Sequence, residues 1–374
     1  MKNVGITGVN GFIGSHLKNQ LVNCNKGFKV IKFDKSFFEN NNKLDDFVEK
    51  CDVIVHLAGV NRHPSSEYVF KKNFELAEKI SNSIKRSKKK IHLIFSSSSQ
   101  EDLKNEYGRA KKKSREEFIK LSQNSILSFS GLIIPNVFGP FCKPNYNSFI
   151  STFSQSIIDE KEVQIIDDNS ISLLYIDNLC RKIIEVIKNN IYSEKLEISS
   201  DVKIKVSEVL KILKYFKKNY VDSLEIPNLK NKFEINLFNT FRSYLPFDFF
   251  PKKCIKHIDE RGFFSELVKS ESGGQFSISL TKKNIERGNH FHTRKIERFI
   301  VIKGEAIVQF RKVGTKEVIS YKISAKDSPT MIDIPVWTAH NIINNSKNEL
   351  ITNFWISEKY DPLDSDTYPL NVRI

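Results

Sequence analysis

The sequence predicts an α/β chain of two domains, an N-terminal doubly wound parallel sheet followed by a C-terminal all-β domain. In residues 1–245, short apolar runs alternate with helical patterns, which is typical of a parallel sheet covered on both faces. In residues 254–374, short runs of alternating polarity are separated by glycine turns, which indicates an antiparallel sandwich or barrel. Residues 246–253 carry two prolines and no helical pattern, and are predicted to form the linker.

The composition sets limits on the class of protein. A chain of 374 residues with 40% hydrophobic residues and 29 Phe can fill two cores. Its five cysteines show no CxxC pair, so we expect free thiols in a reducing compartment. No run approaches the roughly 20 apolar residues of a membrane span, and the N-terminus lacks a signal peptide. The predicted location is therefore cytoplasmic, without a membrane partner.

The net charge of +15 raises the question of nucleic-acid binding. The lysines are spread along the whole chain and are not interleaved with aromatic residues. We expect solvated faces and no nucleic-acid partner.

The N-terminus has the pattern of a dinucleotide site. Val4–Thr7 is predicted to be a buried strand, and a glycine turn leads from it into a helix beginning near Ser15. Such a turn lets backbone amides approach a pyrophosphate, whose charge the helix dipole favours. The pattern therefore predicts a Rossmann-like domain.

The second predicted strand bears on the choice of cofactor. It spans residues 28–33 and ends at Asp34, where an acid binds the ribose 2′-hydroxyl of NAD. Lys32 and Lys35 flank it and could instead neutralise the 2′-phosphate of NADP. The choice between the two cofactors stays open, and Asp34 could also be a simple turn residue.

Two further predicted strands end in polar or small residues. Residues 53–59 form one, in which His56 is expected to be a core histidine. Residues 91–95 form the other and lead into the serines 96–99. Residues 65–86 between them are predicted to be helical.

Tyr107 and Lys111 follow the serines and are four residues apart, so on a helix they share one face. A lysine cation one turn away favours the phenolate, which lowers the pKa of the tyrosine and makes it a useful proton donor to a ketone. A serine hydroxyl can hold the carbonyl oxygen in place.

The glycine turn, the His56–Gly59 stretch, the serines and the Tyr107/Lys111 pair resemble, in order and spacing, the extended short-chain dehydrogenase/reductases. That family comprises nucleotide-sugar epimerases, dehydratases and reductases, and the resemblance covers about residues 1–245. It implies Ser98, Tyr107 and Lys111 as the catalytic residues, with Ser97 or Ser99 as alternatives to Ser98. The expected cofactor contacts are Gly8, Gly11, Phe12, Ile13, Gly14, Asp34, Lys35, Leu57, Ala58, Gly59, Asn73 and Lys111.

The substrate part is expected to begin at residues 135–140, which resemble the corresponding segment of the family. An arginine common just ahead of that segment is missing here. Residues 142–148 form a predicted loop that leads into a helix and is placed to contact sugar and diphosphate. The expected substrate contacts are Asn136, Lys143 and Asn145, although a capped loop without this role is the alternative.

The C-terminal domain carries a predicted metal site. His290 and His292 are two apart, so on a strand both project to one face, and Glu297 follows. With His340, they make three imidazoles and a carboxylate, a set that suits Zn, Mn, Fe or Ni. The pattern resembles a metal-binding cupin, and zinc is the expected metal.

Residues 259–264 and 287–290 also resemble the dTDP-sugar 3,5-epimerases, which are cupins that need no metal. In those enzymes the histidine in the position of His290 is a catalytic base. A metal-bound imidazole cannot also take a proton, and His292 and Glu297 favour the metal. The same resemblance implies that Arg261 contacts a diphosphate.

The whole chain resembles the bifunctional nucleotide-sugar enzymes of capsule and O-antigen synthesis, which join such a reductase to a cupin. The resemblance implies a UDP-2-acetamido-2,6-dideoxy-hexos-4-ulose substrate, C3 epimerisation in the cupin and NAD(P)H reduction at C4. The product would be UDP-2-acetamido-2,6-dideoxy-L-talose, on the route to UDP-N-acetyl-L-fucosamine. A homodimer is expected by resemblance to related reductases.

Two other functions are weighed against this one. A UDP-sugar 4-epimerase or 4,6-dehydratase with a structural cupin is the first. Dehydratases usually place an Asp-Glu pair beside the catalytic hydroxyl, whereas Glu101–Asp102 stand here in reversed order. A non-catalytic metal-dependent binding module is the second, and the intact Ser98, Tyr107 and Lys111 speak against it.

Overall fold

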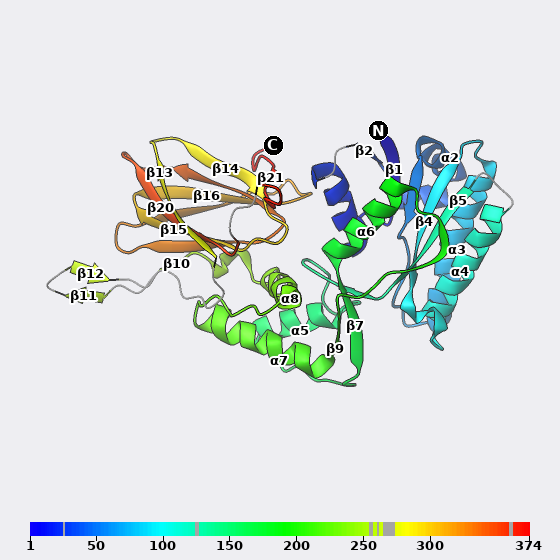
Figure 1. The fold of residues 1–374 in the computed structure, drawn as a ribbon, viewed down its shortest axis with the longest axis horizontal. Helices are drawn as coiled ribbons and strands as arrows, with labels where there is room; N and C mark the ends of the chain where they lie inside the picture. The colour runs from blue at the N-terminus through cyan, green and yellow to red at the C-terminus, as the bar shows by residue number, and fades with distance from the viewer. Residues whose placement is uncertain (25–26, 124–126, 254–256, 260–261, 265–273, 359–361) are drawn as a thin grey trace. The chain divides into compact units, whose positions relative to one another are not determined.

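The structure, a computed structural model, describes residues 1–24, 27–123, 127–253, 257–259, 262–264, 274–358 and 362–374 (Figure 1). The chain divides into two compact units. The first comprises Met1–Phe138, Cys142–Thr152 and Asp168–Lys205. The second comprises Gly139–Phe141, Phe153–Asp167 and Val206–Ile374.

The first unit contains a six-stranded sheet in the order β2-β1-β3-β4-β5-β8, in which every pairing is parallel. Its strands are β1 (Lys2–Thr7), β2 (Phe28–Ile31), β3 (Val53–His56), β4 (Ile91–Ser98), β5 (Leu127–Ile134) and β8 (Ser193–Glu197). The chain reverses direction across the sheet between β1 and β3, the switch point at which such sheets bind ligands. The predicted Rossmann-like domain is confirmed.

Helices connect these strands, as apolar runs alternating with helical patterns predict. They are α1 (Phe12–Asn19), α2 (Asn41–Lys50), α3 (Ser66–Arg86), α4 (Glu106–Gln123) and α6 (Ile176–Asn189), with short turns η1 (Gln20–Cys24), η2 (Lys35–Glu39) and η3 (Ser99–Asp102). One core cluster joins α2, α3 and α4 to the sheet through residues such as Phe47, Ile80, Phe118 and Leu93. A smaller sheet is formed by β6 (Asn136–Phe138), β7 (Ser170–Tyr175) and β9 (Val202–Lys205), and α5 spans Phe149–Ile158.

The second unit contains two antiparallel five-stranded sheets, which confirm the predicted all-β domain and its cupin architecture. One sheet has the order β10 (Lys252–Lys253), β18 (Thr330–Ile334), β15 (Glu297–Lys303), β20 (Leu350–Ile356) and β13 (Gln275–Thr281). The other has the order β17 (Ile319–Ser324), β16 (Glu305–Lys312), β19 (Thr338–Asn344), β14 (Glu286–Phe291) and β21 (Tyr368–Pro369). β11 (His257–Asp259) and β12 (Gly262–Phe264) form a separate hairpin.

Helices α7 (Val206–Phe216) and α8 (Lys232–Arg242), with the turns η4 (Lys217–Asp222) and η5 (Phe247–Phe249), belong to this second unit. The buried carboxylate of Asp333 in β18 ties η4 to the sheet, because it accepts hydrogen bonds from both Arg298 of β15 at 2.7 and 3.1 Å and the hydroxyl of Tyr220 in η4. The compact unit therefore starts before residue 245, the predicted end of the reductase domain. That domain limit stays a prediction.

Four element limits differ from those expected. The strand expected over 28–33 ends at Ile31, the strand expected over 53–59 ends at His56, and the strand expected over 91–95 runs on to Ser98. The predicted linker, 246–253, contains both η5 and β10. Within the described residues, no helix has the length and apolar character required to cross a bilayer. The four described cysteines are free thiols, and Cys254 lies outside the described residues.

Candidate active site and metal centre

The glycine turn lies between β1 and α1, as its sequence predicts. A Cβ on Gly8 would lie 2.8 Å from the backbone nitrogen of Ala58, and one on Gly14 would lie 2.2 Å from the carbonyl oxygen of Gly8. Gly8 also has a φ of +71°, which favours glycine. Gly11 precedes α1 and caps it without a side chain, and no acid stands in the first turn. No side chain caps the start of α1, which favours an anion such as a pyrophosphate there, while the Gly11 amide donates to the Gly8 carbonyl at 2.9 Å.

Asp34 lies just past the end of β2, and it caps the turn η2. Its carboxylate accepts hydrogen bonds from the Ser36 backbone amide at 2.8 Å and the Ser36 hydroxyl at 2.7 Å. These two bonds lower the pKa of Asp34, so it is an exposed, charged acceptor. Lys32 and Lys35 are exposed beside it. The acid expected to bind a ribose hydroxyl and the lysines expected to bind a 2′-phosphate therefore all lie near the end of β2.

The residues after β3 form a turn held from two sides. Thr7 accepts from the Ala58 amide at 3.2 Å, and its hydroxyl lies 2.7 Å from Nδ1 of His56. Asn73, which is buried, donates to the Val60 carbonyl at 2.7 Å and accepts from the Val60 amide at 3.0 Å. Burial lowers the pKa of His56 to about 3, so it is a neutral core histidine. Asn73 therefore holds the turn at the backbone of Val60, directly after Gly59.

The four serines have different surroundings. Ser96 donates to the His56 carbonyl at 3.1 Å, Ser97 donates to Glu101, and Ser99 is exposed. The Ser98 hydroxyl accepts from the Gln100 amide at 3.1 Å, which leaves its hydrogen for a ligand. These contacts favour Ser98 over Ser97 and Ser99 as the hydroxyl that binds a carbonyl oxygen.

Tyr107 and Lys111 lie one turn apart near the start of α4, with the lysine ammonium 5.7 Å from the centre of the phenol ring. Gly108 lets α4 approach the serine turn, because a Cβ there would lie 1.9 Å from the Gln100 carbonyl oxygen. Lys111 is buried and donates to the Ser96 carbonyl at 2.8 Å. The helix therefore brings the pair to the end of β4.

The pKa values of the pair differ from the sequence expectation. Burial, with a further contribution from Tyr146, raises the pKa of Tyr107 above its usual value. The net shift is opposite to the lowering expected from a nearby lysine alone. Burial also lowers the pKa of Lys111 to about 8, while Glu101 opposes that shift. In this structure the phenol is therefore a protonated group, ready to donate.

The predicted substrate residues lie in and beside the small sheet of the first unit. Asn136 is exposed in β6, and Lys143 and Asn145 are exposed in the loop before α5. The Asn145 backbone has a φ of +56° and its amide donates to the Thr152 hydroxyl at 3.0 Å, so the loop is indeed capped. Arg261, the expected diphosphate contact, lies outside the described residues.

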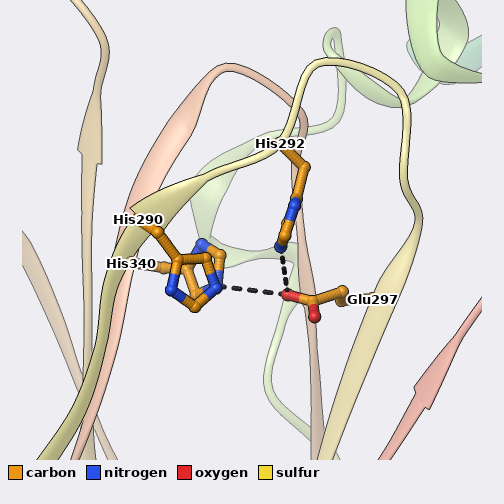
Figure 2. A group of neighbouring side chains, drawn as sticks. All are labelled: His290, His292, Glu297 and His340. Carbon is orange, nitrogen blue, oxygen red and sulfur yellow. Dashed lines mark ion pairs between the residues drawn. The ribbon is translucent and has the colours of Figure 1, made fainter. Parts of the chain in front are cut away.

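The structure brings the four predicted metal ligands together, with their ligand atoms all within 4.8 Å of one another (Figure 2). His290 from β14 and His340 from β19 are cross-strand partners in one sheet, and Glu297 begins β15 of the other. A bulge between Gly288 and His290 shifts the register of β14 just before the first ligand. Gly288 is required there, because its φ is +106° and a Cβ would lie 2.8 Å from the His340 carbonyl oxygen.

The hydrogen bonds of this His/Glu cluster indicate a cation. Nδ1 of His292 lies 2.6 Å from the Asp366 carbonyl, and Nδ1 of His340 lies 3.2 Å from the Thr338 carbonyl. A carbonyl only accepts, so both Nδ1 atoms carry hydrogen, and each ring, when neutral, presents an Nε2 lone pair. The Nε2 atoms face the Glu297 carboxylate at 3.0 and 3.1 Å, and the three buried atoms have no hydrogen-bond partner. Against the effect of burial, Glu297 raises the pKa of His292, so its Nε2 favours a positive charge, a proton or a cation.

Lone pairs and a carboxylate cannot face one another in a buried site without protons or a cation between them. Three imidazoles and one carboxylate fit zinc and the other first-row cations named above. Burial, followed by the neighbouring His340 and His292, lowers the pKa of His290 to about 4, so its ring is neutral and can bind a cation. The residues present therefore fit a divalent metal.

Two residues near these sites were not singled out as functional from the sequence. In the sequence Glu101 is distinguished only by its order with Asp102, yet it lies buried under the serine turn and bonds Ser97. Asp366 reaches His292 across 74 positions of the chain, and no local pattern signals such a contact.

Comparison with known proteins adds the family. A model described as the NAD dependent epimerase/dehydratase family matches residues 4–198. A second, described as the polysaccharide biosynthesis C-terminal domain, matches residues 257–368. The two matches follow the two predicted kinds of domain.

Individual relatives cover the whole chain. It is 31% identical over 369 residues to the Pseudomonas aeruginosa protein named UDP-2-acetamido-2,6-beta-L-arabino-hexul-4-ose reductase, covering 98% of each chain. The crystal structure of the capsular polysaccharide assembling protein CapF from Staphylococcus aureus is similar with a TM-score of 0.63 and 32% identity. That similarity covers 99% of this chain and 100% of CapF.

The predicted resemblance to two-domain nucleotide-sugar enzymes of capsule synthesis is confirmed by these matches. One family model spans more than half of the chain, and a relative aligns along nearly all of it. The chain therefore belongs to the NAD dependent epimerase/dehydratase family.

Proposed function

We propose that this protein reduces the C4 ketone of a UDP-2-acetamido-2,6-dideoxy-hexos-4-ulose and epimerises the same sugar at C3. NADPH is the expected reductant, with NADH as the alternative, and zinc is the expected metal. The product would be UDP-2-acetamido-2,6-dideoxy-L-talose, for capsule or O-antigen synthesis. The printed name of the Pseudomonas aeruginosa relative supports the reductase activity and the class of substrate.

The observation that carries the reduction is the placement of Ser98, Tyr107 and Lys111 around the end of β4. The bound nicotinamide supplies a hydride to C4. Ser98 donates its hydroxyl hydrogen to the C4 oxygen and orients the carbonyl. Tyr107 gives that oxygen its proton, and the Lys111 cation stabilises the phenolate that remains. One hydride and one proton convert the ketone to an alcohol.

The carboxyl end of the sheet also supports the cofactor assignment. The start of α1 has no side-chain cap and so favours a pyrophosphate, while Asp34 and Lys35 stand where the ribose is expected. The exposed Lys35 and Lys32 favour the 2′-phosphate of NADP. Asp34, which caps η2 and is exposed, keeps NAD as the alternative.

The His/Glu cluster supports the epimerisation. A divalent cation held there would act as a Lewis acid on the ketone and so acidify the proton at C3. We propose His290, His292, Glu297 and His340 as its ligands. Because His290 would bind the metal, it is not available as the base, and the base stays unassigned.

Proton NMR in D2O tests both steps with the UDP-4-keto-6-deoxy sugar as substrate. Deuterium should enter at C3 before NADPH is added, and a 4-hydroxy sugar should appear afterwards. Tyr107→Phe should stop the reduction and leave the exchange, whereas Glu297→Gln should do the reverse. Loss of both activities in Tyr107→Phe would contradict two separate sites.

Other results of the NMR experiment would favour the alternatives. Reduction without C3 exchange would leave a 4-ketoreductase with a structural cupin. If neither signal appeared, the 4-epimerase and 4,6-dehydratase alternatives would be favoured. A homodimer and a cytoplasmic location belong to the proposal as well, and size-exclusion chromatography with light scattering checks the first.

A further inference from the structure

We propose that Asp366 is a positioning residue of the cation site, because the turn it makes in the C-terminal segment holds the His292 ring with Nε2 toward the other ligands. The inference rests on the proposed binding of a divalent cation by the His/Glu cluster. It assigns a role in that binding to a residue that reaches the cluster only through the fold.

Asp366 makes five hydrogen bonds to one short segment. Its carbonyl accepts from Nδ1 of His292 at 2.6 Å. Its carboxylate accepts from the backbone amides of Thr293, Arg294 and Lys295 at 3.1, 3.0 and 2.9 Å, and from the Thr293 hydroxyl at 2.6 Å. The residue is only 3% exposed. The segment that contains His292 is therefore fixed at every backbone amide from 293 to 295.

The backbone of Asp366 makes this double contact possible. Its φ is +42°, in the left-handed region that aspartate and asparagine enter more readily than most residues. In this conformation both its carbonyl and its carboxylate meet the 292–295 segment. The carboxylate thus sets the place of the carbonyl, and the carbonyl sets the orientation of the imidazole.

The chain after Asp366 is anchored beside His290, the ligand that lies on β14. Strand β21 pairs with β14, so that Tyr368 lies opposite Phe291 and Pro369 opposite His290. The Leu370 amide then donates to the Asn289 carbonyl at 2.8 Å. The C-terminal segment is therefore held along the whole stretch that carries the first two ligands.

A carbonyl on Nδ1 has a definite chemical effect. It keeps the hydrogen on Nδ1, so Nε2 keeps the lone pair that a cation needs, and it limits rotation of the ring. Without the carboxylate, the 366 turn would lose four of its five bonds to the segment. We expect weaker cation binding from a ring that is free to turn, not a different ligand set.

The test compares Asp366→Ala and Asp366→Asn with Asp364→Asn as the matched control. Asp364 belongs to the same segment but pairs with Arg294 at an exposed position. In Asp366→Asn, the side-chain NH2 would face two backbone amides that now donate to the carboxylate, so an intermediate loss is expected. Zn²⁺ affinity is measured by chelator competition on the full chain, and the absorption spectrum of the Co²⁺ form reports the geometry around the cation.

We expect the Zn²⁺ Kd to rise roughly 10- to 100-fold in Asp366→Ala, the range seen when a partner of a metal-ligating histidine is removed. The Co²⁺ spectrum should change in the Asp366 variants. Asp364→Asn should match the wild type in its Zn²⁺ Kd, its Co²⁺ spectrum and its NADPH-dependent reduction. A Kd within twofold of the wild type in both Asp366 variants would overturn the inference. Circular dichroism shows whether the metal-free Asp366 variants are folded at the temperature of the assay. If they are unfolded, Asp366 has a structural role and the inference is overturned too.

Zn²⁺ and Co²⁺ binding by the wild type distinguishes a failure of this inference from a failure of the proposed cation site. If wild-type protein bound neither Zn²⁺ nor Co²⁺, the proposed cation site would fail, and Asp366 would lose its role with it. If the wild type bound Zn²⁺ tightly and the Asp366 variants bound it equally well, the site would stand and only the role of Asp366 would fall.

Discussion

Arg115 donates from Nε and Nη2 to both carboxylate oxygens of Glu101, at distances from 2.7 to 3.2 Å. The side chains are 10% and 3% exposed, and Glu101 also accepts from Ser97. Nη1 of Arg115 donates to the Glu194 carbonyl at 3.2 Å. One buried ion pair therefore joins the serine turn, helix α4 and strand β8.

Glu101→Gln should destabilise the protein strongly, because it leaves a guanidinium buried without its counter-charge. We expect a loss of about 3 kcal/mol in the free energy of unfolding, near the lower end for a broken buried pair. Urea denaturation measures it. Asp102→Asn is the control, since Asp102 is exposed and its pair with Lys112 should contribute less than about 1 kcal/mol. Equal losses in the two variants would contradict the importance of the buried pair.

Ketone reduction should lose activity as the pH rises through about 8. Burial lowers the pKa of Lys111 to about 8, and above that value the amine is neutral and cannot stabilise the phenolate of Tyr107. The measurement is kcat/KM against pH, which reports the groups of the free enzyme.

The same pH profile tests the influence of Glu101 on Lys111. Glu101 favours the charged lysine, so Glu101→Gln should move the alkaline limb to lower pH. Asp102→Asn should leave the limb in place. The groups that face Lys111 are Glu101 from η3, Tyr107 from α4 and His56 from β3. A profile that stays flat from pH 7 to about 9.5 would show that Lys111 does not titrate there.

Gly14→Ala should weaken NADPH binding far more than Gly11→Ala. A Cβ on Gly14 would lie 2.2 Å from the Gly8 carbonyl oxygen and 2.9 Å from the Val9 Cα, so the turn must shift. On Gly11 it would meet only the same oxygen, at 3.1 Å. We expect at least about a tenfold rise in the Kd for Gly14→Ala, equal to about 1.4 kcal/mol. Fluorescence titration with NADPH measures it, and similar Kd values for the two variants would count against the close approach.

With a divalent cation bound at the His/Glu cluster as proposed, its removal should destabilise the second unit. A ligand present at about 1,000 times its Kd stabilises the folded state by roughly 4 kcal/mol, and a chelator abolishes that contribution. Differential scanning calorimetry with and without EDTA should show a lower Tm for the transition of the β domain. In Glu297→Gln, which weakens the site, EDTA should have a much smaller effect. An unchanged Tm of the wild type in EDTA would argue against bound metal.

The parallel sheet and the serine and tyrosine motifs were predictable because their signals are local. Glycine spacing, strand periodicity and the four-residue step from Tyr107 to Lys111 all follow from backbone geometry. The direction of the Tyr107 pKa shift was not predictable, since it comes from burial. The choice among the serines was also open, because it depends on their hydrogen bonds in the fold. Ser96 donates to the His56 carbonyl, Ser97 donates to Glu101, and Ser98 accepts from the Gln100 amide.

The sequence by itself determined the class of the two domains, the glycine turn, the Tyr107/Lys111 pair and the four residues of the His/Glu cluster. Each depends on residue type and short spacing, which the chain displays directly. Only the tertiary structure decided that helices α7 and α8 belong with the β sheets, through Tyr220, Arg298 and Asp333. It also decided that Asp366 contacts His292, and that Glu101 lies buried against Arg115. Such contacts join segments distant along the chain, and burial and charge pairing select them only once the sheets have formed.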